Sequence, residues 1–207
     1  MSFIKTFLSI LTVFLLFIYF TGCSSTEQTT AKLAFQQGDY KKAELEFDKE
    51  TKQNPNNEEA AYWLGQTLIA PDEDKDIEGA KAVYQKGLTA NPNSGLLNAG
   101  MGHIEILEGK TQQARNHFET AISLSGGKSI DVLDAVGFAN ADFDSKFGDA
   151  AYAVEKLTLA TNTKKFKDAR IMTDLGDAYR KLGDGGTAQR TYEAALAMDP
   201  TYARAKY

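Results

Sequence analysis

The sequence is poor in the residues on which most enzyme active sites depend. Its 207 residues include one cysteine, Cys23, and two histidines, His103 and His117. A single cysteine cannot form an internal disulfide. The chain has no His-Glu-x-x-His motif, no complete Gly-x-x-x-x-Gly-Lys-Ser phosphate loop and no Gly-x-Ser-x-Gly elbow. These absences favour a protein that is not an enzyme and holds no cofactor or metal. We expect His117 to lie on the outward side of a helix, where its side chain is solvated.

One acidic stretch, residues 72–78, places carboxylates at alternate positions, as calcium loops do. Ile77 stands where a calcium loop needs glycine, and Val83 stands where it needs a closing glutamate. A charged, solvated loop between two helices is therefore the preferred interpretation, and a hydrolase built on this stretch is the weakest alternative. Three further carboxylates indicate a calcium site more weakly: Asp142, Asp144 and Asp149.

Positive charge is also scarce. Without Lys5, 22 of the 23 basic residues remain against 28 acidic ones, a net charge of −6 for residues 23–207. This balance disfavours a nucleic-acid partner and electrostatic adhesion to anionic lipid.

The apolar run from Phe7 to Phe20 has 14 residues, which is short for a bilayer-spanning helix. Residues 1–22 fit a signal peptide better. The following Phe20-Thr21-Gly22-Cys23 resembles the lipobox of bacterial lipoproteins, except that leucine is usual at the position of Phe20. This resemblance implies lipidation of Cys23, a tether over 23–29, and a periplasm-facing anchor in the outer membrane. An uncleaved anchor and simple secretion are the alternatives.

The rest of the chain is repetitive, with a period of 34 residues where it is undisturbed, as over 24–57 and 95–128. One column holds small residues: Ala31, Gly65, Gly102, Gly137 and Gly176. A second holds alanine: Ala43, Ala80, Ala114, Ala150 and Ala188. A bulky apolar residue follows four positions later: Phe47, Tyr84, Phe118, Val154 and Tyr192.

These columns predict pairs of helices. A small residue in the first helix would face the alanine of the second and let the two backbones approach closely. The bulky residue would point into the groove of the following repeat, because residues four apart share a helix face. Proline after most units ends the second helix.

The pattern resembles the tetratricopeptide repeat (TPR) family, most clearly in "LGDAYRKLGD" and "YEAALAMDP" of the last unit. The resemblance implies an all-α, right-handed superhelix of about five repeats. Glu50 replaces a small residue in the first unit, the second carries a loop insertion, and a spacer follows the fourth. The expected units are 24–57 (degenerate), 58–94, 95–128, 129–168 (degenerate) and 169–202.

Residues 203–207 match the start of another first helix. We expect the faces of Tyr192, Ala195 and Leu196 to lie uncovered. Either further repeats or domains follow in a longer envelope protein, or a partner supplies the missing helix.

In TPR proteins the first helices line a concave groove that binds a protein or peptide. That register assigns the following residues of this chain to the groove: Glu59, Tyr62, Gln66, Ile69, Ala99, His103, Ile106, Asp134, Phe138, Ala141, Thr173, Asp177 and Arg180. Exposed rings at Tyr62 and Phe138 would suit a peptide. The alternative is that these rings only pack against neighbouring helices.

The resemblance therefore implies a membrane-tethered scaffold that binds a protein partner in the cell envelope. TPR lipoproteins serve in outer-membrane assembly, pilus secretin assembly, secretion and gliding, although a fold alone does not fix a function. A peptidoglycan- or glycan-associated accessory module is the main alternative, and it would need aromatic platforms along the groove.

Overall fold

The computed structural model describes residues 26–70, 75–162 and 168–206, and the expected signal peptide and Cys23 lie outside them. Within these ranges the chain forms ten α-helices, one short 3-10 helix and no strand. The first five helices are α2 (Thr26–Gln36), α3 (Tyr40–Gln53), α4 (Glu58–Leu68), α5 (Ile77–Ala90) and α6 (Gly95–Leu107). The others are α7 (Thr111–Leu124), α8 (Ile130–Ala141), α9 (Ala150–Thr161), α10 (Ala169–Leu182), α11 (Gly185–Met198) and the 3-10 helix η1 (Ala203–Lys206).

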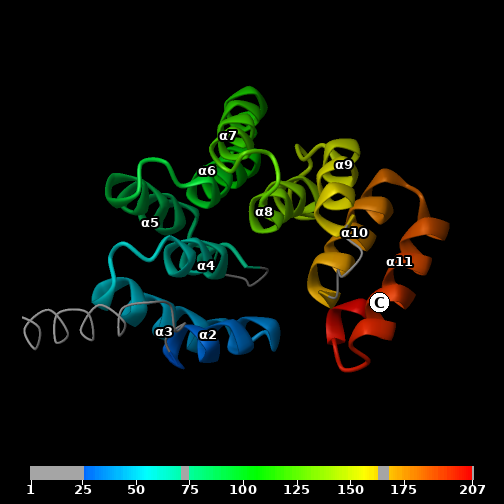
Figure 1. Ribbon diagram of the computed structural model, residues 1–207, viewed down its shortest axis with the longest axis horizontal. Helices are drawn as coiled ribbons and strands as arrows, with labels where there is room; N and C mark the ends of the chain where they lie inside the picture. The colour runs from blue at the N-terminus through cyan, green and yellow to red at the C-terminus, as the bar shows by residue number, and fades with distance from the viewer. Residues whose placement is uncertain (1–25, 71–74, 163–167, 207) are drawn as a thin grey trace, which may run out of the picture.

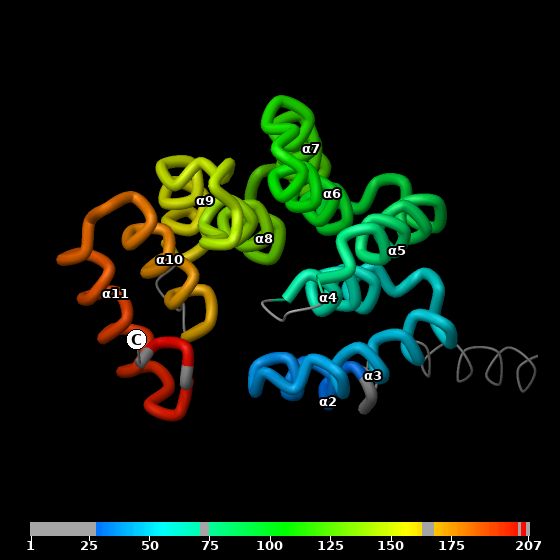
Figure 2. Tube along the Cα trace, turned by 180° about the vertical axis from the view of Figure 1, so that it is seen from behind, coloured from blue at the N-terminus to red at the C-terminus, as the bar shows by residue number. Residues whose placement is uncertain are grey.

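The helices stack as antiparallel pairs around an open arc (Figure 1). Helices α4, α6, α8 and α10 lie toward its inside, and α5, α7, α9 and α11 lie outside. Successive inner helices contact one another, α4 with α6, α6 with α8, and α8 with α10. Seen from behind, η1 and α2 face each other across the opening of the arc (Figure 2). The all-α stack of helix pairs agrees with the fold class expected from the repeat.

Most helices begin at a residue whose side-chain oxygen accepts a hydrogen bond from the free backbone N–H groups of the first turn. These capping residues are Asp39, Asn57, Asp76, Ser94, Ser129, Asp149, Asp168 and Asp184. The exception among α3–α11 is α7, whose N-cap Lys110 makes no such bond. The polar residues between the apolar runs therefore set where the helices start.

The glycine column packs differently from the prediction. A Cβ built on each of these glycines would lie 2.3–2.4 Å from the bulky side chain of the second helix in the same pair. The pairs are Gly65 with Tyr84, Gly102 with Phe118, Gly137 with Leu157, and Gly176 with Tyr192. The bulky residue, and not the alanine, thus occupies the space that each glycine leaves. The bulky residue can also contact the next repeat, as the Tyr84 ring does at Gly100 of α6.

The fourth unit is shifted by three residues from the predicted register. Ala153 is fully buried as the fourth residue of α9, the place that Ala80, Ala114 and Ala188 hold in α5, α7 and α11. Ala150 is only half-buried. The assignment of Ala150 to the alanine column is therefore wrong, because the extra residues of this unit lie before α9, in the loop 142–149.

The buried Glu50 has a specific role in the first unit. Its Oε1 accepts hydrogen bonds from the side-chain amides of Asn54 and Asn57, both at 2.9 Å. These bonds offset part of the cost of burying a carboxylate. The pair Asn54 and Asn57 thus allows glutamate where other units carry a small residue.

The last helix is better covered than expected. Tyr192 and Ala195 are buried, and Leu196 packs with Tyr202 and Ala205 beside Ala195. Residues 203–206 form the 3-10 helix η1 and not the start of an α-helix. The prediction of a bare face at Tyr192 and Ala195 is wrong. The ring of Tyr192 packs against Gly176 of α10, and the chain after Asp199 turns back so that Tyr202 and Ala205 pack beside Ala195.

Candidate functional site

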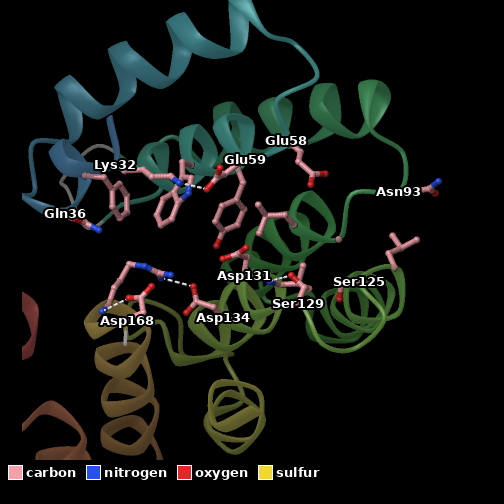
Figure 3. Close-up of a pocket in the computed structure, with 18 residues that line it drawn as sticks. Lys32, Gln36, Glu58, Glu59, Asn93, Ser125, Ser129, Asp131, Asp134 and Asp168 are labelled. Carbon is pink, nitrogen blue, oxygen red and sulfur yellow. Dashed lines mark hydrogen bonds and ion pairs between the residues drawn. The ribbon is translucent and has the colours of Figure 1, made fainter. Parts of the chain in front are cut away.

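Two cavities lie on the inside of the arc. The first, of about 580 Å³, is called here the acidic cavity and is drawn in Figure 3. The second, of about 490 Å³, is called here the aromatic cavity, because Phe35, Tyr40, Phe138, Phe143 and Tyr202 line it. Phe35, Gln36 and Arg170 contribute to both. The two cavities are therefore adjacent parts of one inner surface.

Most residues assigned to the groove from sequence line one of these cavities. In the acidic cavity these are Glu59, Tyr62 and Asp134. In the aromatic cavity they are Gln66, Ile69, His103, Phe138, Ala141, Asp177 and Arg180. The remaining three, Ala99, Ile106 and Thr173, line neither. All three are buried between helices.

The aromatic platform expected at Tyr62 is absent. Its side chain is only 6% exposed, and its ring packs against Trp63 and Tyr84. Burial raises the pKa of the Tyr62 hydroxyl well above its usual value, helped by nearby Tyr84 and Asp134. Phe138 is half-buried. The prediction of an exposed Tyr62 is wrong, so the feature that a glycan-binding module would need from this ring is not there.

Charged side chains form a network across the inner surface. Arg170 Nη1 lies 2.7 Å from Asp134 Oδ2 and 3.1 Å from Asp174 Oδ2. Arg204 Nη2 lies 2.8 Å from Asp174 Oδ1 and 2.6 Å from Asp177 Oδ2. The network ties α8 to α10 and α10 to η1. It also shows that this surface accommodates guanidinium groups between carboxylates.

Burial governs the acidity of the network. It raises the pKa of Asp134 to about 7, against the attraction of Arg170, and the charge of Asp174 acts in the same direction as burial. The carboxylates around Arg170 raise its pKa despite burial, so the guanidinium stays charged. Asp134 therefore keeps its proton to a higher pH than an ordinary aspartate does.

His103 and His117 both bond to carboxylates. His103 Nε2 lies 3.0 Å from Asp142 Oδ2, and His103 Nδ1 has no hydrogen-bond partner within the described residues. His117 Nδ1 lies 2.7 Å from Glu105 Oε2, and its side chain is 33% exposed. The prediction that His117 is simply solvated is therefore wrong, because Glu105 of α6 lies within reach of α7.

Sequence reasoning missed Arg170, Asp174, Arg204 and Trp63. The first two lie four residues apart on α10, which places them on one helix face, and that spacing was a readable signal. The pairing of Arg204 with Asp174 spans 30 residues and depends on how η1 folds back. No pattern within a single helix predicts the pairing of Arg204 with Asp174.

Within the described ranges, no three side chains of His, Cys, Asp or Glu are placed to hold a metal ion. Gly127-Lys128-Ser129 lacks the earlier glycine of a phosphate loop, since Ile122 stands there, and Ser129 caps α8 instead. None of the helices that the structure describes is long and apolar enough to cross a bilayer. Asp72, Glu73 and Asp74 of the acidic stretch lie outside these ranges.

A family model described as "Tetratricopeptide repeat" matches residues 29–95 and 173–207. The chain therefore contains tetratricopeptide repeats, and its fold is an all-α TPR solenoid. This fold generally serves as a scaffold for protein–protein interaction and not for catalysis. A search of curated proteins finds no match to the chain.

Solved structures of the same fold include TTC0263, a thermophilic TPR protein of Thermus thermophilus. It is 20% identical, with a TM-score of 0.56, over 85% of this chain and 93% of that chain. The Cut9–Hcn1 structure of the APC/C is 16% identical, with a TM-score of 0.56, over 87% and 34%. The pilF protein of Pseudomonas aeruginosa is 18% identical, with a TM-score of 0.51, over 69% and 61%. At these identities the likeness concerns the fold alone.

Proposed function

We propose that this chain is a membrane-tethered scaffold whose inner surface binds an extended segment of a partner protein in the cell envelope. The observation that carries the proposal is the pair of adjacent cavities inside the arc, which together offer room, charge and aromatic surface. An extended peptide uses such a surface well, because its side chains can enter separate pockets along the groove.

The tether is proposed from sequence. Cys23 directly follows Gly22 at the end of the apolar run, where a lipoprotein would be cleaved and acylated. Buried acyl chains contribute about 0.8 kcal/mol per CH₂, so several chains would hold the protein at the membrane. We propose the outer membrane, facing the periplasm, as its location, and assembly, secretion or gliding machinery as its setting.

The groove can be tested by site-specific photo-crosslinking. Gln36 is exposed and lines both cavities, whereas Glu119 is exposed on the outer helix α7. A photo-reactive amino acid at Gln36 should crosslink a discrete envelope protein in cells, and the same group at Glu119 should not. Equal crosslinking from both positions, or none from Gln36, would contradict groove binding.

The tether has a separate test. In cells that express the full chain, Cys23→Ser should move the protein out of the membrane fraction and abolish the incorporation of labelled palmitate. Retention in the membrane fraction would show that lipidation of Cys23 is not the anchor.

A further inference from the structure

The acidic cavity has an excess of negative charge. Five carboxylates line it against two cations, Lys32 and Arg170. The carboxylates come from opposite walls, as Figure 3 shows, and are Glu58, Glu59, Asp131, Asp134 and Asp168. This arrangement favours a positively charged occupant.

The two cations of the cavity are already engaged. Lys32 Nζ forms an ion pair with Glu59, and Arg170 lies between Asp134 and Asp174. Glu58 and Asp131 are exposed and form no ion pair within the ranges that the structure describes. Two carboxylates from facing helices, α4 and α8, are thus available to an incoming cation.

A second observation points to a ligand at the same place. Asp134 lines the cavity and is only 5% exposed, yet its Oδ1 has no hydrogen-bond partner among the described residues. A buried polar atom without a partner costs free energy, and native structures rarely leave one unexplained. A donor brought by a ligand, after a small rotation of the carboxyl group, would satisfy it.

The walls suit a cation that is carried on an aliphatic stem. Tyr62 and Trp63 line the cavity, and the guanidinium of Arg170 already lies 5.5 Å from the centre of the Trp63 ring. Lysine and arginine side chains pack their methylene groups on apolar surface while the charged end meets carboxylates. Elsewhere on this face, Arg204 sits between Asp174 and Asp177 in the same manner.

We infer that the acidic cavity is a specificity pocket for a lysine or arginine side chain of the partner segment, whose charge is met by Glu58 and Asp131. This inference rests on the proposed function, since it names the chemistry of the segment that the groove binds. Residues of the segment beyond the basic one would run toward the aromatic cavity, because the two cavities share Phe35, Gln36 and Arg170.

The test uses random dodecapeptides displayed on phage and selected on the immobilised protein. Selected peptides are then synthesised and titrated while the fluorescence of Trp63, the only tryptophan of the chain, is followed. We expect a lysine or arginine at one fixed position. Its replacement by norleucine, which keeps the stem without the charge, should weaken binding about ten-fold or more, as the loss of charge-assisted contacts does.

Variants of the protein locate the contact. Glu58→Gln and Asp131→Asn should each weaken binding of the basic peptide and leave the norleucine peptide nearly unaffected. The matched control Glu119→Gln removes an exposed carboxylate on the outer face and should change neither.

The outcomes separate the inference from the proposed function. Selected peptides that alter Trp63 fluorescence but lack a basic residue, or that bind equally well with norleucine, would overturn the inference and leave groove binding intact. Selected peptides that leave the fluorescence of Trp63 unchanged, and that crosslink only to α5 or α7, would overturn both the inference and the proposed function.

Discussion

The ring of Phe118 lies against the backbone of Gly102, so close that a Cβ on Gly102 would be 2.4 Å from Phe118 Cε1. Both residues are buried in the middle of the stack, between α6 and α7. The absence of one side chain on the first helix therefore makes room for a large one on the second.

Gly102→Ala should lower the free energy of unfolding. The added methyl group would displace the Phe118 ring, and overpacking of this kind costs about 1–3 kcal/mol, more than the roughly 1 kcal/mol that alanine gains in helix propensity. Urea denaturation followed by circular dichroism measures the change. Gly186→Ala on α11 is the matched control, because its nearest neighbour is 3.7 Å away, and we expect it to be neutral or stabilising. An unchanged stability of Gly102→Ala would contradict the packing described.

The sequence predicted the helix pairs well, because the features that begin and end them are local. Capping residues such as Asp39 and Asp184 and the prolines after the second helices act within one turn. The register of the fourth unit failed for a local reason too. Ala150 and Ala153 lie three residues apart, so both fit one helix face, and only the length of the loop 142–149 decides between them.

The inner surface was predicted less completely. Glu59, His103 and Arg180 could be assigned because their repeat register places them on first helices. The ion pair of Arg170 with Asp134 joins the fifth repeat to the fourth and depends on the curvature of the stack, whereas that of Arg204 with Asp177 depends on how η1 folds back. Curvature arises from many small packing terms, so no short pattern encodes it. For Tyr62, the alternative that its ring only packs against its neighbours is confirmed, since the ring lies against Trp63 and Tyr84.

Ala153 and Ala150 offer a direct test of the corrected register. Ala153→Leu places a large side chain at a fully buried position beside Leu157, and we expect a loss of about 1–3 kcal/mol. Ala150→Leu adds the same atoms at a half-buried position and should be tolerated. Thermal denaturation of the two variants distinguishes the registers. The opposite order of stability would restore the register read from the sequence.

Asp134 should make stability depend on pH. Its folded pKa of about 7 lies above the ordinary value of 3.8, so the folded state binds the proton more tightly than the unfolded state does. The contribution of Asp134 to the free energy of unfolding is fully present below about pH 4 and is lost as the pH rises through 7. Asparagine mimics the protonated group and does not titrate.

The comparison is therefore between wild type and Asp134→Asn in urea at pH 5 and pH 8. Raising the pH should reduce the unfolding free energy of the wild type by more than that of the variant. The two proteins differ only at residue 134, so effects of pH that are common to both cancel in the difference. Identical pH dependence of the two proteins would show that Asp134 is ionised throughout this range.

Lys181 holds the loop 142–149 against α10. Its Nζ donates hydrogen bonds to the backbone oxygens of Asp142, at 2.5 Å, and Ser145, at 2.8 Å. The same loop is bound to α6, where Ser145 Oγ donates to Ile106 O at 3.2 Å. The loop thus bridges the third and fifth repeats and fixes their relative position.

Lys181→Met keeps most of the unbranched side chain but removes the ammonium group that donates both bonds. Because hydrogen bonds from charged groups contribute about 1.5–3 kcal/mol in buried settings and less when partly exposed, we expect a loss of about 1–2 kcal/mol. Amide hydrogen exchange should accelerate in residues 142–149 and much less in α5 and α7. Lys86→Met, at an exposed position of α5, is the control for removing a positive charge. Unaltered exchange in the loop would mean that Ser145 and His103 suffice to hold it, and that Lys181 does not brace the repeats.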